Sequence, residues 1–144
     1  MRVSFVYRDE DWRTAIDDIE KFSRYVLKST FKIAGVKPVA GSEVSVLLTN
    51  DAEIMKLNKK WRGKDKATDV LSFPTDDEML PGDIVISLCT LLHDAKLQGK
   101  SFRTHYARLL VHGALHLLGF DHMDKYDADE MEFFEAKILK EVGL

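Results

Sequence analysis

Hydrophobic and polar residues follow one another along the chain in patterns that predict four short strands and five helices. The predicted strands are residues 2–7, 43–48, 68–74 and 83–87. The predicted helices are residues 11–33, 50–62, 88–97, 101–118 and 126–142. No repeat or low-complexity segment interrupts them. This mixture predicts one α+β domain, residues 1–144, with a small mixed sheet of about four strands packed with helices.

The same patterns assign particular side chains. Trp12 belongs to the apolar stripe of the first helix and is expected in the core. Asn50 and Glu53 are spaced as a capping box, with Glu53 reaching back to the cap. Ser87 is expected to cap the helix that follows it. The inward face of the helix after Asn50 is predicted to carry Ile54, Leu57 and Trp61.

The length and the hydrophobic content of the chain allow it to form a sizeable core. It has 144 residues, of which 45% are hydrophobic, and no apolar run approaches the roughly 18 residues of a membrane span. Cys89 is the single cysteine; it excludes an internal disulfide and is expected to be a small core residue. The amino-terminal residues lack the apolar segment of a signal peptide. These features predict a cytoplasmic protein without membrane contact, and a monomer.

The net charge of −3 argues against a surface that binds nucleic acid everywhere. Charge is nevertheless clustered. The basic cluster consists of Lys56, Lys59, Lys60, Arg62, Lys64 and Lys66. The acidic cluster consists of Asp121, Asp124, Asp127, Asp129, Glu130, Glu132 and Glu135, and is expected to be a solvated helix face.

Three histidines at the end of the predicted helix 101–118 carry the strongest chemical signal. His112 and His116 are four residues apart, which places two imidazoles on one helical face. Gly119 can adopt the left-handed conformation that ends a helix and returns His122 toward the same point. Three imidazoles with a fourth position left for water are typical of catalytic zinc. Nickel, copper and iron also suit such ligands.

The spacing is that of the metzincin motif HExxHxxGxxH, with one departure. Gly113 stands where that motif has glutamate, the general base of a metalloprotease. Its absence counts against peptide hydrolysis by that mechanism.

A metal-bound water needs an electrophile to attack, and the basic cluster suggests that this electrophile is a phosphate. Arg62 presents a planar fork of donors that fits two phosphate oxygens. The neighbouring lysines expected to extend this field along a phosphodiester chain are Lys59, Lys60, Lys64 and Lys66. The alternative is a solvated helix end, where the helix dipole favours cations.

Three further residues have two interpretations each. Asp121 either orients a ligand imidazole or assists proton transfer, or it caps the turn after Gly119. His105 lies too far from His112 along a straight helix to share its metal, and is expected to be a satisfied structural histidine rather than part of a substrate groove. His93 is also expected to be structural.

The segment His112-Gly-Ala-Leu-His-Leu-Leu-Gly-Phe-Asp-His122 resembles the signature of the YbeY family, HGxLHLxGYDH, with Phe120 in place of tyrosine. Other blocks are similar to that family in the same order along the chain. They are Leu57-Asn58, Trp61-Arg-Gly-Lys-Asp-Lys66, Thr68-Asp-Val-Leu-Ser-Phe-Pro74 and Gly82-Asp-Ile-Val-Ile-Ser87.

This resemblance implies a metal-dependent endoribonuclease that cleaves single-stranded RNA in ribosomal RNA maturation, at the 3′ end of the small-subunit RNA, and in ribosome quality control. It implies one zinc ion on His112, His116 and His122, Arg62 as a functional arginine, and a zincin-like fold. The residues themselves leave two alternatives open: a metal-dependent hydrolase of peptides or amides, and a non-catalytic ribosome assembly factor stabilised by zinc.

Overall fold

The computed structural model of the chain describes residues 1–77, 79–120 and 124–144, which form four strands and six helices. The strands are β1 (Arg2–Tyr7), β2 (Glu43–Thr49), β3 (Val70–Pro74) and β4 (Gly82–Ser87). The helices are α1 (Trp12–Ala15), α2 (Ile19–Ile33), α3 (Asp51–Arg62), α4 (Leu88–Leu97), α5 (Phe102–Leu117) and α6 (Lys125–Glu141). The predicted mixture of helices with a four-stranded sheet is confirmed. Among these described helices, none has both the length and the apolar character needed to cross a bilayer.

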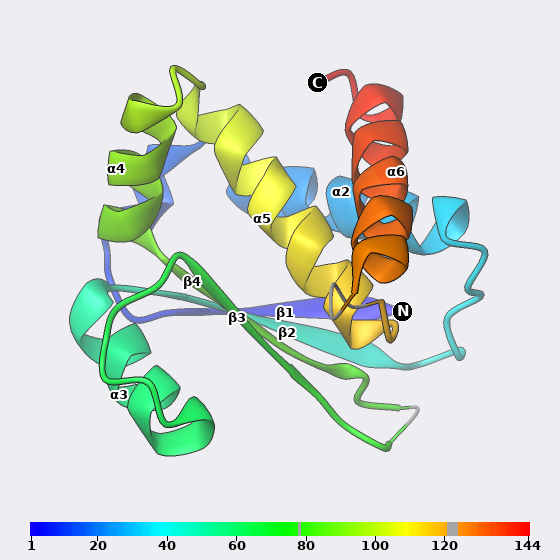
Figure 1. Cartoon of the computed structure of the whole chain (residues 1–144), viewed down its shortest axis with the longest axis horizontal. Helices are drawn as coiled ribbons and strands as arrows, with labels where there is room; N and C mark the ends of the chain where they lie inside the picture. Colours follow the sequence, from blue (N-terminus) through cyan, green and yellow to red (C-terminus); the bar gives the residue numbers. More distant parts are fainter. Residues whose placement is uncertain (78, 121–123) are drawn as a thin grey trace.

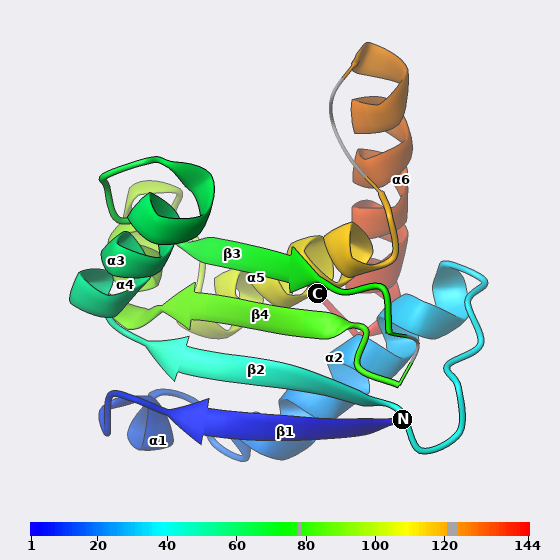
Figure 2. The same ribbon diagram turned by 90° about the horizontal axis from the view of Figure 1, so that it is seen from below.

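The four strands form one mixed sheet in the order β1-β2-β4-β3 (Figure 2). β1, β2 and β4 are parallel, and β3 joins the edge antiparallel to β4. In this register Val46 of β2 lies between Phe5 of β1 and Ile84 of β4. β3 therefore pairs only with β4 among the described strands and lies at an edge of the sheet.

Helices cover the two faces of the sheet unequally (Figure 1). α5 lies against β3 and β4, and α2, α4 and α6 pack around α5 on the same side. Because successive strand side chains point to opposite faces, Ile84 and Ile86 enter this main core whereas Val85 faces the other way. There Val85 packs with Leu71 and with Ile54 of α3.

The predicted single helix over residues 11–33 is wrong, because the chain breaks it in two. Ile16 is extended, and Asp18 adopts a left-handed conformation at φ 51° before α2 begins. Only a few residues other than glycine adopt this conformation, and aspartate is among those enriched there. Trp12 is buried as expected, and its indole Nε1 donates to the Thr49 carbonyl oxygen at 2.8 Å.

Two residues expected in the core lie at the surface. Trp61 is 62% exposed, with the Lys60 ammonium 4.9 Å from its ring centroid. Cys89 is also exposed. Both lie on helices with one covered face, and in each case the residue falls outside that face. The periodic pattern located these two helices correctly but did not fix where the elements that cover them end.

The predicted helix caps are confirmed in part. The Asn50 side chain accepts from the Glu53 amide at 3.0 Å, but Glu53 itself accepts from the Thr49 hydroxyl at 2.7 Å instead of returning to the cap. Ser87 occupies the cap position of α4 without a capping bond. Its hydroxyl donates to Asp51, at the start of α3, and so links two helix ends.

Gly113 is a point of close contact between α5 and the sheet. A Cβ atom at this position would lie 2.9 Å from Ile84 Cγ2 and 3.1 Å from Ser72 Oγ. The Ser72 hydroxyl donates to the Gly113 carbonyl oxygen at 3.0 Å. A glutamate in this place has no room, so the departure from the metzincin motif follows from helix–sheet packing.

We expect Gly113→Ala to lower the free energy of unfolding by about 1–3 kcal/mol, the usual cost of overpacking a core. This overpacking cost opposes the gain in stability of about 1 kcal/mol that alanine has over glycine in a helix interior. Urea denaturation followed by circular dichroism measures the difference. A variant more stable than the wild type would show that helix propensity outweighs the contact with Ile84 and Ser72.

Candidate functional site

A cavity of about 660 Å³ opens between the carboxyl end of α3, the edge strand β3 and the carboxyl end of α5. It brings together five of the residues predicted from sequence, namely Arg62, Lys64, Lys66, His112 and His116. Its other walls are formed by Asn58, Thr68, Asp69, Val70, Leu71, Ser72, Pro74, Gly119 and Phe120. The size is within the range of about 300–1,000 Å³ typical of ligand-binding pockets.

Lys59 and Lys60, predicted to bind substrate, are not among the described residues that line this cavity. Lys59 forms an exposed ion pair with Asp65 at 3.6 Å, and Lys60 lies over the Trp61 ring. The basic wall of the cavity therefore consists of Arg62, Lys64 and Lys66.

A buried amide holds the loop that carries this wall. Gly63 ends α3 at φ 69°, and its amide bonds to the Lys59 carbonyl. Asn58, which is almost completely buried, donates from Nδ2 to the Lys66 carbonyl oxygen at 3.0 Å. This bond spans the loop and keeps Lys64 and Lys66 beside the cavity. No local sequence pattern indicates this role of Asn58, because its partner is a backbone atom.

His112 and His116 lie one turn apart on α5, and their imidazoles meet at the cavity. The two Nε2 atoms are 3.1 Å apart, and the ring centroids are 4.6 Å apart. Nitrogen atoms this close either share a proton or bind one ion together. For a tetrahedral zinc ion with bonds of about 2.0–2.1 Å, two ligand nitrogens lie about 3.3 Å apart. The donor set and its spacing therefore fit the ion implied by the sequence.

Glu135 of α6 supports the first of these histidines. Its Oε1 accepts from His112 Nδ1 at 2.9 Å, and its side chain is only 13% exposed. Because an ionised carboxylate only accepts, the proton lies on Nδ1 and the lone pair on Nε2 points away from Glu135. Such a carboxylate–imidazole pair is the usual support of a metal-binding histidine.

The assignment of the whole acidic cluster to a solvated face is therefore wrong for Glu135. Its neighbour Glu132 is exposed, as expected. α6 brings Glu135 to the site because its apolar residues Met131 and Ile138 are buried in the main core. Which of these two glutamates reaches the site depends on how α6 packs against α5, and no local sequence pattern predicts that packing.

The helix end after His116 has the predicted geometry. Gly119 has φ 94°, its amide bonds to the His116 carbonyl at 3.1 Å, and the Phe120 amide bonds to the Leu115 carbonyl at 3.0 Å. These two bonds form a Schellman motif. The Phe120 ring then packs on Phe134 of α6, with 5.1 Å between ring centroids. The predicted ligand His122 and the predicted catalytic Asp121 lie outside the described residues.

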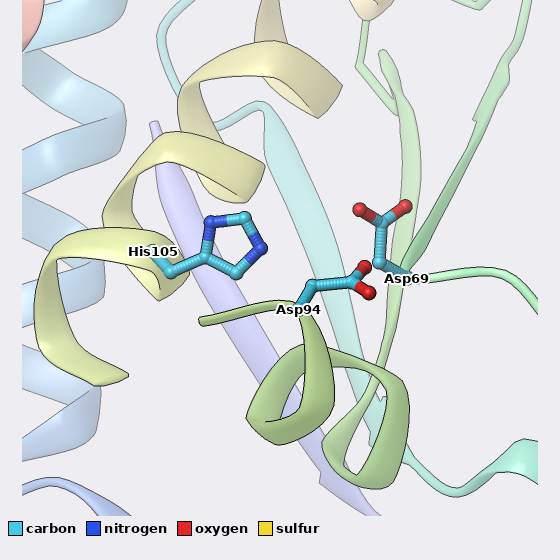
Figure 3. A group of neighbouring side chains, drawn as sticks. All are labelled: Asp69, Asp94 and His105. Carbon is cyan, nitrogen blue, oxygen red and sulfur yellow. The ribbon is translucent and has the colours of Figure 1, made fainter. Parts of the chain in front are cut away.

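His105 is not the satisfied structural histidine that was expected. It is 2% exposed, and neither ring nitrogen has a hydrogen-bond partner among the described residues. Asp69 and Asp94 lie beside it, so that these three side chains form a group whose composition could hold a metal ion (Figure 3). His93, also expected to be structural, is exposed on α4.

The fold and site define a protein of mixed helices and strands with a cavity that combines imidazoles with a guanidinium group and two ammonium groups. The family model described as Endoribonuclease YbeY matches residues 6–143. The chain therefore belongs to the YbeY family.

Relatives and a solved structure agree with this assignment. The Endoribonuclease YbeY of Methylocella silvestris is 40% identical over 139 residues, covering 94% of this chain and 78% of its own. That of Azorhizobium caulinodans is 37% identical over 150 aligned residues, covering 100% and 94%. The solution structure of TM1509 from Thermotoga maritima matches with a TM-score of 0.66 and 25% identity, covering 97% of this chain and 88% of its own.

Proposed function

We propose that this chain is a zinc-dependent endoribonuclease that cleaves single-stranded RNA in the cytoplasm. Its proposed substrate is ribosomal RNA, during maturation of the small-subunit 3′ end and in ribosome quality control. The observation that carries the proposal is the cavity in which His112 and His116 face the same space as Arg62, Lys64 and Lys66. The relatives named as endoribonucleases support the same reaction. We further propose one zincin-like domain, residues 1–144.

His112, His116 and His122 would hold the zinc ion, or another divalent ion such as nickel. His122 and Asp121 enter from the motif alone, Asp121 as a residue that orients a ligand or moves a proton. When bound, zinc lowers the pKa of a water ligand to about 7 and polarises a phosphoryl oxygen. The bond from His112 Nδ1 to Glu135 supports this assignment, because it fixes the imidazole with its Nε2 lone pair available.

Arg62, Lys64 and Lys66 have the chemistry to bind the RNA backbone. Arg62 can donate two parallel hydrogen bonds to one phosphate and so neutralise charge that develops during cleavage. Lys64 and Lys66 are exposed, and the flexible lysine stem would let their ammonium groups reach neighbouring phosphates as point charges. The cavity of about 660 Å³ is large enough to hold part of an RNA strand.

Cleavage of a labelled single-stranded RNA that spans a small-subunit 3′ end tests this proposal. We expect purified protein to cut it, and we expect both a chelator and His116→Ala to abolish cleavage because each removes the metal. Product ends then distinguish two routes, since a 2′,3′-cyclic phosphate arises from attack by the ribose hydroxyl rather than by water.

The alternatives give different results in the same assay. Folded, metal-loaded protein that leaves RNA intact would favour the assembly factor stabilised by zinc. Hydrolysis of casein or small amides in place of RNA would favour the amide hydrolase, although Ser72 and Ile84 leave no room for a general-base carboxylate at Gly113.

Arg62→Ala is expected to lower kcat for RNA cleavage on the order of 100-fold, the usual effect of losing one transition-state donor. Bound metal should be unchanged, because Arg62 belongs to the opposite wall of the cavity. Lys56→Ala is the matched control, since it removes one positive charge from the exposed surface of the same helix. Equal losses in the two variants would mean that only net charge matters.

Glu135→Gln is expected to weaken zinc binding by about 10- to 100-fold, because an amide holds the His112 imidazole less firmly than a carboxylate does. Competition with a chromogenic chelator measures this affinity. Glu132→Gln changes the same charge on the exposed face of α6 and should leave the affinity unaltered. An unchanged affinity in Glu135→Gln would show that the bond to His112 does not support a ligand.

A further inference from the structure

A second group of metal-ligating side chains lies apart from His112 and His116. It consists of Asp69, Asp94 and His105, and one potential ligand atom from each lies within 4.8 Å of the other two (Figure 3). Asp69 immediately precedes β3, Asp94 belongs to α4 and His105 to α5. Three elements that are separate in sequence therefore converge on one point.

The buried imidazole of His105 is the observation that points to a ligand. Its ring is directed toward the two carboxylates in Figure 3, yet neither nitrogen has a hydrogen-bond partner among the described residues. Buried polar atoms are nearly always bonded, so an orphaned pair calls for an explanation. Burial lowers the pKa of His105, although Asp69 and Asp94 act in the opposite direction. The imidazole is thus neutral near pH 7 and keeps a lone pair.

The two carboxylates are placed to complete such a site. Asp69 Oδ1 accepts from the Val70 amide at 2.8 Å and from the Thr68 hydroxyl at 3.4 Å, which fixes the orientation of this carboxylate. Asp69 also lines the large cavity, so an ion in solution can reach it. Both aspartates are half-buried. Their charges are therefore partly desolvated and lie beside a neutral ring.

We propose that Asp69, Asp94 and His105 form a second divalent-cation site, which takes a first-row ion such as Zn²⁺ or Mn²⁺ and ties β3, α4 and α5 together. Two carboxylates and one imidazole form a mixed oxygen and nitrogen donor set that suits these ions. With bonds of about 2.0–2.2 Å, ligand atoms lie about 3–4 Å apart. The side chains reach this geometry by small rotations, and water completes the coordination.

This site is independent of the histidine pair. His105 precedes His112 by seven residues, which is about 10 Å along a helix. Ions that act together in two-metal catalysis lie about 3.5–4 Å apart. The two sites therefore bind separate ions, and the proposal does not rest on the endoribonuclease function.

Counting bound zinc in four forms of the full chain tests the proposal. They are the wild type, His112→Ala/His116→Ala, Asp94→Asn and the combination of these changes. Asp94→Asn preserves shape at a half-buried position, so the fold should persist. Mass spectrometry after dialysis against micromolar Zn²⁺ should show half the wild-type zinc in the second and third proteins and none in the fourth. His93→Gln, an exposed neighbour on α4, is the control and should match the wild type.

The location of the ion is checked in the His112→Ala/His116→Ala protein. Adding Zn²⁺ should shift one ring-nitrogen NMR signal of His105 and raise the Tm, and Asp94→Asn should remove both effects. If Asp94→Asn binds as much zinc as the wild type, or the His105 signals do not move, the second site is overturned. If His112→Ala/His116→Ala retains all the zinc while Asp94→Asn loses it, this site stands and the zinc proposed at the histidine pair fails.

Discussion

The close contact between α5 and the β3–β4 pair fixes the geometry on which the candidate site depends. Gly113 allows this contact, because any side chain there would meet Ile84 and Ser72. Gly82 allows a second one at the start of β4, where a Cβ atom would lie 2.6 Å from Leu117 Cδ2. His112 is adjacent to Gly113 and His116 follows one turn later. Both imidazoles are therefore held at a fixed distance from β3, which forms another wall of the cavity.

Much of the fold was predictable because its signals are local. Strand alternation, the Asn50 cap and the glycine after α5 act within a few residues, and the structure confirms the elements they predict. The failures have different causes. The left-handed conformation of Asp18 breaks a helix whose apolar pattern continues across it. The exposure of Trp61 depends on how far neighbouring elements extend over α3. Periodicity shows which face of a helix is apolar, but not how far the neighbouring elements cover that face.

The contacts of the candidate site are also of two kinds, those set by local sequence and those made by long-range packing. The spacing of His112 and His116 is a property of one helix, and their meeting at 3.1 Å follows from it. Glu135 reaches His112 only because α6 docks on α5, across 23 residues of sequence. Asp69, Asp94 and His105 come together through three elements, and each reads alone as an ordinary surface or core residue. Long-range packing creates these contacts, so no motif in the sequence could predict them.

The charges around the cavity connect the two proposals. In the proposed function Arg62, Lys64 and Lys66 would attract a phosphate backbone to a chain whose net charge is −3, whereas Asp69 on the same cavity would repel it. A divalent ion at the proposed second site would neutralise the charges of Asp69 and Asp94 and remove that repulsion. It would thus favour RNA in the cavity without touching the bond that is cleaved.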